Sequence, residues 1–244
     1  MSDVGALSRN PFGLIKSAPL PRSASTARHL YLEDLRAVVN YVNNLEGHVT
    51  GTLERKRARQ RWLWFAYLLS GLRISELLNH TTHHIYSEMS GGEKVWMMAV
   101  AGKGRAHAEP HPLPDQFLEE LWRYRASLDL EPWPQTPAPL VVSLSGTKAM
   151  TNRSTAHKTL KDFIDQVAQS QETQGNFDSA ARLRTASTHW LRHSFVTCLL
   201  DTTTDIPAVS SLARHRDLKT TMRYDHSELG ALKSVLNEFA NAVS

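Results

Sequence analysis

The chain has 244 residues, a hydrophobic fraction of 41% and a formal net charge of +4. This length supports a sizeable core, which excludes wholesale disorder, and the mild basic excess permits a polyanionic partner. The single cysteine, Cys198, excludes an intramolecular disulfide and a cysteine-based metal site. No apolar run reaches the ~18 residues of a membrane span, and the first residues lack the apolar region of a signal peptide. We therefore expect a soluble intracellular protein.

Residues 1–28 have the composition of an arm or linker. They contain Pro11, Pro19 and Pro21, several serines and little apolar periodicity. Basic residues outnumber acidic ones in this segment, which fits an extended path along a phosphate backbone. The same composition fits a disordered tail equally well.

Two helices are expected next. Apolar residues recur at spacings of three and four from Leu32 to Val42, which predicts an amphipathic helix. A basic run at 54–61 then passes directly into the apolar segment 62–69, which predicts a helix solvated at its start and buried at its end. Gly71 should stop that helix, and a further helix should begin near Ile74.

The middle of the chain predicts a small sheet and one long helix. Segments 93–100 and 106–113 are rich in strand formers, and Gly102-Lys103-Gly104 between them is typical of a tight hairpin turn. Four prolines in 131–139 indicate a loop, with a short strand at 141–144. Residues 152–170 show helical periodicity, and 171–184 should form an exposed insertion because they are polar.

The last third is again helical. Residues 188–200 place apolar side chains on one face, and Asp205 is a good N-cap for the helix that follows. A short helix is expected over 217–224. The final amphipathic helix, 228–242, could pack on its own domain or on a neighbouring protomer. The expected fold class is therefore α+β, mainly α-helical, with one small antiparallel sheet or hairpin.

The common enzyme signatures are missing from the sequence. It contains no GxxxxGK[ST], GxGxxG, HExxH or GxSxG pattern, so neither ATP-driven chemistry nor a zinc protease is indicated. The cluster His80/His83/His84 is more typical of surface residues than of a metal site. What remains is a scattered set of cations and one tyrosine: Arg73, Lys103, His189, Arg192, His215 and Tyr224. Each of them alone has an ordinary structural interpretation, such as an ion pair between Arg73 and Glu76.

Taken together, these short motifs resemble the catalytic domain of the tyrosine recombinases, the phage integrase family. The order is GLRISEL at 71–77, a hairpin lysine, HWLR at 189–192, and LARHRDLKTTMRY at 212–224. The resemblance implies that 29–244 form this catalytic domain, without the core-binding domain that usually precedes it. Arg214 stands where the family usually has glycine, which predicts either an altered helix junction before His215 or an added phosphate contact.

The resemblance implies a site-specific DNA recombinase or integrase of a mobile element, acting through a covalent 3′-phosphotyrosine. Tyr224 would be the nucleophile, because a phenoxide leaves more easily than an alkoxide and so keeps the intermediate reversible. Arg73 and Arg192 would clamp the phosphate oxygens with His215, His189 would orient the phosphate or accept a proton, and Lys103 would protonate the leaving 5′-oxygen. No cofactor, ATP or metal is required.

The implied partner is double-stranded DNA in a bacterial cytoplasm, with no membrane and with a homotetramer on DNA left open. Glu76 is expected to be a buried support for Arg73 rather than a chemical group. An alternative remains: a truncated, non-catalytic DNA-binding remnant or a regulator of a recombination system.

Overall fold

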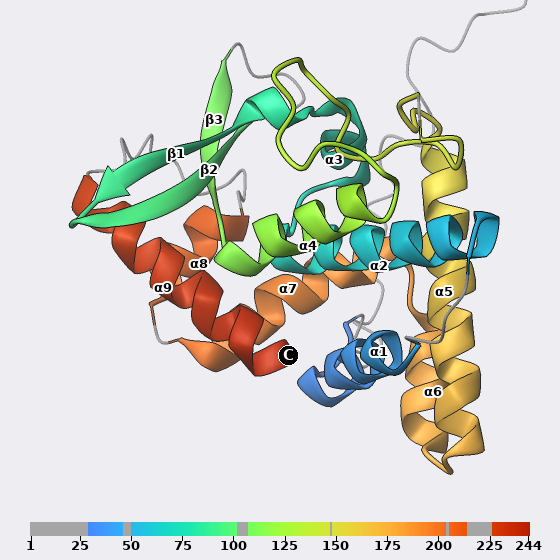
Figure 1. Cartoon of the computed structure of the whole chain (residues 1–244). Coiled ribbons are helices and arrows are strands. Elements are labelled where there is room, and N and C mark those ends of the chain that lie inside the picture. The colour runs from blue at the N-terminus through green and yellow to red at the C-terminus, as the bar shows by residue number, and fades with distance from the viewer. Residues whose placement is uncertain (1–28, 46–49, 102–106, 147, 204, 214–225) are drawn as a thin grey trace, which may run out of the picture.

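The computed structural model describes residues 29–45, 50–101, 107–146, 148–203, 205–213 and 226–244. A three-stranded sheet lies on one side of the molecule, and helices make up the rest (Figure 1). The helical elements are α1 (Leu32–Asn44), α2 (Thr52–Ser70), α3 (Ile74–Asn79), the 3₁₀ turn η1 (Thr82–His84), α4 (Asp115–Ala126), α5 (Arg153–Thr173), α6 (Phe177–Thr185), α7 (Thr188–Thr202), α8 (Ile206–Ala213) and α9 (His226–Val243). The predicted mainly helical α+β class is confirmed. The predicted arm at 1–28 and the short helix at 217–224 lie outside the described residues.

Helix α2 is the central element of the core. Its first residues are exposed, and every residue from Trp62 to Ser70 is buried, as the basic-to-apolar sequence predicts. It contacts α3, α4, α5, α7 and β3, so it is surrounded on several sides. An all-round apolar segment of this kind has to be buried. The helix ends at Gly71, which adopts the left-handed conformation that glycine accepts without steric cost.

The sheet has the order β1-β2-β3, with β1 (Ile85–Ser90), β2 (Glu93–Ala101) and β3 (Ala108–Leu113). Both pairings are antiparallel, with Ile85 opposite Met98 and Trp96 opposite Leu113. The predicted antiparallel pair is confirmed, and β1 is an additional strand that the sequence analysis missed. The predicted hairpin turn with Lys103 lies outside the described residues.

One prediction for the middle of the chain was wrong and one was incomplete. Residues 141–144 form no strand; one isolated bridge joins Val142 to Ala149. Residues 171–184 are mostly exposed, as predicted, but they are helical: they form the end of α5 and most of α6, and the two helices pack side by side at one end of the molecule (Figure 1). Helix α6 buries Ala180 and Leu183.

Helix α9 packs on its own domain. Its apolar stripe is buried, and the helix contacts α1, α4, α7, α8 and all three strands. The Phe239 ring of α9 lies edge-on against the Phe195 ring of α7, with ring centroids 5.5 Å apart. The stripe is therefore part of the core in this chain. Across the described ranges, no helix combines the length and apolarity needed to cross a membrane.

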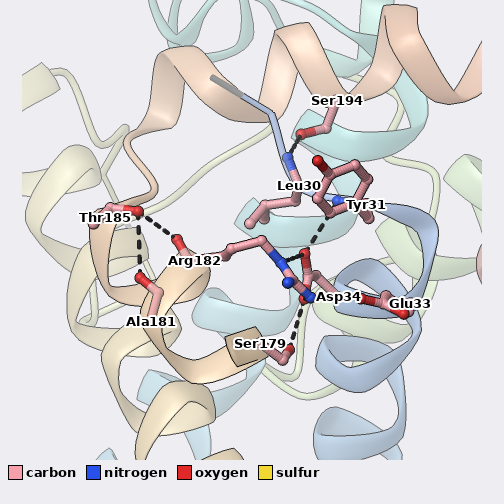
Figure 2. Close-up of polar contacts among 9 residues, drawn as sticks. All are labelled: Leu30, Tyr31, Glu33, Asp34, Ser179, Ala181, Arg182, Thr185 and Ser194. Atoms are coloured by element: carbon pink, nitrogen blue, oxygen red, sulfur yellow. Dashed lines mark hydrogen bonds and ion pairs between the residues drawn. The ribbon is translucent and has the colours of Figure 1, made fainter. Parts of the chain in front are cut away.

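A buried acidic group fastens α1 to α6 (Figure 2). Asp34 is fully buried, and its carboxylate accepts hydrogen bonds from the Tyr31 backbone N–H at 3.1 Å and from the Ser179 hydroxyl at 2.6 Å. Arg182 binds both carboxylate oxygens at 2.8 Å. The Leu30 backbone N–H donates to the Ser194 hydroxyl of α7 at 2.8 Å. The bond from Leu30 holds the start of the described domain against α7, the helix that also carries Arg192.

Arg182→Met should test this junction, because it removes the cation and keeps most of the side-chain volume. The Asp34 carboxylate would stay buried without its charged partner, so the free energy of unfolding should fall by about 3 kcal/mol at pH 7. Adding Asp34→Asn should recover part of that loss. The control Arg184→Met breaks a solvent-exposed pair with Glu172, so it should cost much less stability than Arg182→Met. Equal losses in chemical denaturation of the two single variants would contradict this role.

Gly71, in the turn between α2 and α3, lies very close to Phe195 of α7. Its φ is +58°, and a Cβ added there would lie 2.3 Å from Cδ1 of Phe195. The missing side chain therefore lets the turn between α2 and α3 lie directly on α7.

Gly71→Ala should lower the free energy of unfolding by about 2–4 kcal/mol, the sum of the left-handed strain and the overpacking against Phe195. Gly91→Ala is the matched control, because Gly91 has a φ of +60° and nothing within 4 Å of the added Cβ. It should lose only the conformational part, about 1 kcal/mol. If thermal or denaturant unfolding shows the same loss for both variants, the contact with Phe195 does not limit this position.

Candidate active site

Arg73 stands at the start of α3, two residues after the left-handed turn at Gly71. The Glu76 carboxylate accepts the Arg73 backbone N–H at 2.8 Å and a guanidinium N–H at 3.0 Å. The Arg73 side chain is 55% exposed, whereas Glu76 is only 6% exposed. Glu76 is thus the buried support that the sequence analysis expected. It fixes the direction of a guanidinium whose outer part faces solvent.

Arg192 reaches the same turn from α7. One of its terminal nitrogens donates to the Gly71 carbonyl and the other to the Ala213 carbonyl at the end of α8. A single guanidinium thereby joins the turn between α2 and α3, helix α7 and the end of α8. The residue after Ala213 begins the segment 214–225, which lies outside the described residues and contains Arg214, His215 and Tyr224.

His189 lies one helical turn before Arg192 on α7 and is exposed. Its Nε2 lies 3.0 Å from Nε2 of His193, and the two rings meet edge to face. One of the two rings must donate and the other accept in that contact. The two imidazole rings thus form a hydrogen-bonded pair at the exposed start of the helix that also carries Arg192.

The start of α7 is also joined to the start of α5. The Thr188 hydroxyl lies 2.6 Å from Nδ1 of His157. Arg153, His157 and Lys158 are exposed on the first turns of α5. Burial lowers the pKa of His157, and the charge of Arg153 lowers it further. The permanent charges of Arg153 and Lys158 therefore continue the cationic surface from α7 onto α5, an extension that the sequence analysis missed because each of these residues resembles an ordinary exposed helix residue.

Tyr67 is a further group that the sequence analysis missed. It is buried one turn before Gly71, between the charges of Glu76 and Arg192. Burial raises the pKa of the Tyr67 phenol far above its usual value, the Glu76 carboxylate raises it further, and Arg192 opposes the shift. The Tyr67 phenol therefore stays protonated and uncharged beside Arg192. The apolar segment 62–69 indicated that Tyr67 is buried, but nothing in the sequence places it beside Arg192.

The structure brings Arg73 and Arg192 to one turn and places His189 on the same helix as Arg192. The other three predicted residues, Lys103, His215 and Tyr224, lie outside the described residues. Two permanently charged guanidiniums at one turn can bind the oxygens of a phosphate with short charge-assisted hydrogen bonds. The described part of the chain contains no group of three or more potential metal-binding side chains.

Comparison with known proteins gives consistent matches. The family model described as "Phage integrase family" matches residues 29–229. The tyrosine recombinase XerC of Pelobacter propionicus is 26% identical over 235 residues, covering 96% of this chain and 66% of that protein. The XerC of Anoxybacillus flavithermus is 28% identical over 225 residues, covering 90% of this chain and 64% of the relative.

The fold also resembles a solved structure. A XerH site-specific recombinase bound to difH substrate, in a pre-cleavage complex, has a TM-score of 0.52 and 21% identity, over 85% of this chain and 53% of that one. The chain therefore spans about two thirds of these curated relatives and about half of the solved recombinase. Because the family model covers most of the sequence and the fold agrees, the chain belongs to the phage integrase family.

Proposed function

We propose that this chain cuts and rejoins double-stranded DNA as a site-specific recombinase or integrase, through a 3′-phosphotyrosine intermediate at Tyr224. The observation that carries the proposal is the Arg192 guanidinium bound to the Gly71 carbonyl, two residues before Arg73. Within a chain of this family, that contact places both predicted phosphate-binding arginines at one turn. The similarity to relatives named tyrosine recombinases, and to a site-specific recombinase solved with its difH substrate, supports the same function.

The two arginines supply the electrostatic part of the mechanism. During transesterification, negative charge gathers on the two non-bridging oxygens of the scissile phosphate. Arg73, held by Glu76, and Arg192, held by Gly71 and Ala213, are oriented before the phosphate arrives. Oriented donors need no reorganisation in the transition state, and each is worth on the order of 3–4 kcal/mol of barrier. His215 would add a donor to the same oxygens.

The covalent step conserves the energy of the phosphodiester. The Tyr224 hydroxyl attacks phosphorus, the bond from phosphorus to the 5′-oxygen breaks, and Lys103 gives that oxygen a proton. His189 accepts the phenol proton or orients the phosphate, since an imidazole can do either near neutral pH. In the reverse direction a free 5′-hydroxyl attacks the phosphotyrosine and releases Tyr224. No ATP or metal takes part in these steps.

The cationic side chains on α5 extend the proposed DNA surface. Arg153, His157 and Lys158 are exposed where α5 meets the start of α7, beside His189. Arg153 and Lys158 are placed to neutralise backbone phosphates next to the scissile one, which supplies affinity without reading sequence. We place the activity in the cytoplasm, on DNA, where homotetramer formation would bring two duplexes together.

The proposal is tested with a library of nicked duplexes whose central base pairs are randomised. Strand cleavage beside the nick releases a short fragment, which traps the protein–DNA adduct for denaturing gels and sequencing. The full chain should form an adduct in the presence of EDTA, and Tyr224→Phe should reduce it at least about 10³-fold because the nucleophilic oxygen is gone. Tyr31→Phe, a change at an exposed tyrosine of the domain, is the control and should leave adduct formation unchanged.

Two outcomes would contradict the proposal. An adduct that persists in Tyr224→Phe would assign the nucleophile elsewhere. Retention of duplexes on the chain without any adduct would favour the non-catalytic DNA-binding alternative.

A further inference from the structure

His80 is a buried histidine between α3 and η1, with 4% of its surface exposed. Both ring nitrogens have backbone partners: Nδ1 binds the Glu76 carbonyl, and Nε2 lies 3.3 Å from the Ala101 backbone N. A carbonyl can only accept and an amide N–H can only donate. Nδ1 therefore carries the proton and Nε2 accepts, so the ring is neutral and in one tautomer. With both nitrogens engaged, His80 has none to offer a metal.

The two partners of His80 belong to the two sides of the site. Glu76 is the residue whose carboxylate orients Arg73. Ala101 is the last residue of β2, and Lys103 follows two residues later. One imidazole therefore ties the helix that begins after Arg73 to the strand that leads to Lys103.

The sheet itself explains why this bond is needed. Strand β1 begins at Ile85, which pairs with Met98 of β2. Residues 99–101 of β2 thus extend past the start of β1 on that side, and the His80 ring binds the Ala101 N–H there in place of a strand. On its other side the end of β2 pairs with β3, where Ala101 lies opposite Ala108.

The surroundings keep the ring fixed and neutral. The His80 carbonyl accepts the Leu140 N–H at 3.3 Å, and the His84 ring packs edge-on against the His80 ring. The titratable groups around it are Glu76 of α3 and His84 of η1, while β2 contributes backbone groups. Burial lowers the pKa of His80 and His84 lowers it too, against the opposing effect of the backbone carbonyls of Glu76 and Ala99 and of the Glu76 carboxylate. Nε2 therefore remains an acceptor at neutral pH.

We propose that His80 is a positioning residue: by holding the end of β2 against α3, it sets the reach of Lys103 toward the phosphate that Arg73 binds. This role rests on the function proposed above, with Lys103 as the general acid. It affects protonation of the leaving 5′-oxygen and leaves phosphate binding intact. Nothing in the sequence around His80 indicates it, because only the fold brings Ala101 to His80.

Three substitutions separate the two bonds of the ring. His80→Gln carries its amide at the distance of Nε2 and can still accept the Ala101 N–H. His80→Asn carries its amide at the distance of Nδ1 and can reach only the Glu76 carbonyl. His80→Leu fills the site and makes neither bond. The role proposed here requires the strand bond, so Gln should preserve activity whereas Asn and Leu should not.

The readout is the single-turnover rate of adduct formation on a duplex selected from the library, made with either oxygen or sulfur at the 5′ position of the scissile phosphate. A thiolate, whose conjugate acid has a pKa of ~8.5, leaves without a proton donor. We expect His80→Asn and His80→Leu to slow the oxygen substrate about 10–100-fold and the sulfur substrate less than about 3-fold. Lys103→Ala should show the same pattern more strongly, and Arg73→Ala should be slow on both substrates.

Equal slowing of both substrates by His80→Leu, or no slowing, would overturn the positioning role while the proposed function stands. A wild-type chain that forms no adduct with either substrate would overturn the proposed function, and this role with it. Hydrogen exchange at the Ala101 amide tests the link without DNA. Wild type and His80→Gln should protect this amide, and His80→Leu and His80→Asn should expose it at least about tenfold more; unchanged protection in His80→Leu would overturn the link itself.

Discussion

The site depends on one interaction, the pair of hydrogen bonds from the Arg192 guanidinium to the carbonyls of Gly71 and Ala213. These bonds join three segments that are distant in sequence. They form only because α7 lies directly against the turn after α2, and that approach requires a residue without a side chain at Gly71, next to Phe195. Packing of the aromatic core thus determines where the permanent charges of the site stand.

The residues around the two guanidiniums orient them, and none of these residues adds a competing positive charge. Glu76 is buried and holds Arg73 by two bonds, Tyr67 is a neutral phenol, and His80 is a neutral imidazole with both nitrogens engaged. A half-exposed guanidinium backed by a buried carboxylate keeps its direction before any anion binds, which is the condition for electrostatic stabilisation of a transition state. The buried Asp34–Arg182 junction fixes the entry of the chain in the same way, at a distance from the site (Figure 2).

The sequence predicts the elements whose signal is local. The periodicity of Leu32 to Val42, the stop at Gly71 and the cap at Asp205 all gave helices that the structure contains, and Asp205 accepts the Ala208 N–H at 2.9 Å. Helix α6 was missed because it buries only two apolar residues, Ala180 and Leu183, and is also held by Arg182, whose partner Asp34 lies far away in sequence. Arg73 and Arg192 were identified by family resemblance, but their meeting at Gly71 is a property of the fold. His80 was interpreted as a surface residue for the same reason, since its burial depends on where β2 ends.

Arg192 is proposed to act on the charge of the scissile phosphate, beyond fastening the turn at Gly71. The most direct test compares adduct formation by wild type and Arg192→Ala on a duplex with an ordinary scissile phosphate and on one with a neutral methylphosphonate there. If the guanidinium offsets negative charge on the phosphate oxygens, the variant should lose about 10²–10³-fold in rate on the phosphate and far less on the methylphosphonate. An equal loss on both substrates would contradict the account, because it would mean that Arg192 only holds the fold together.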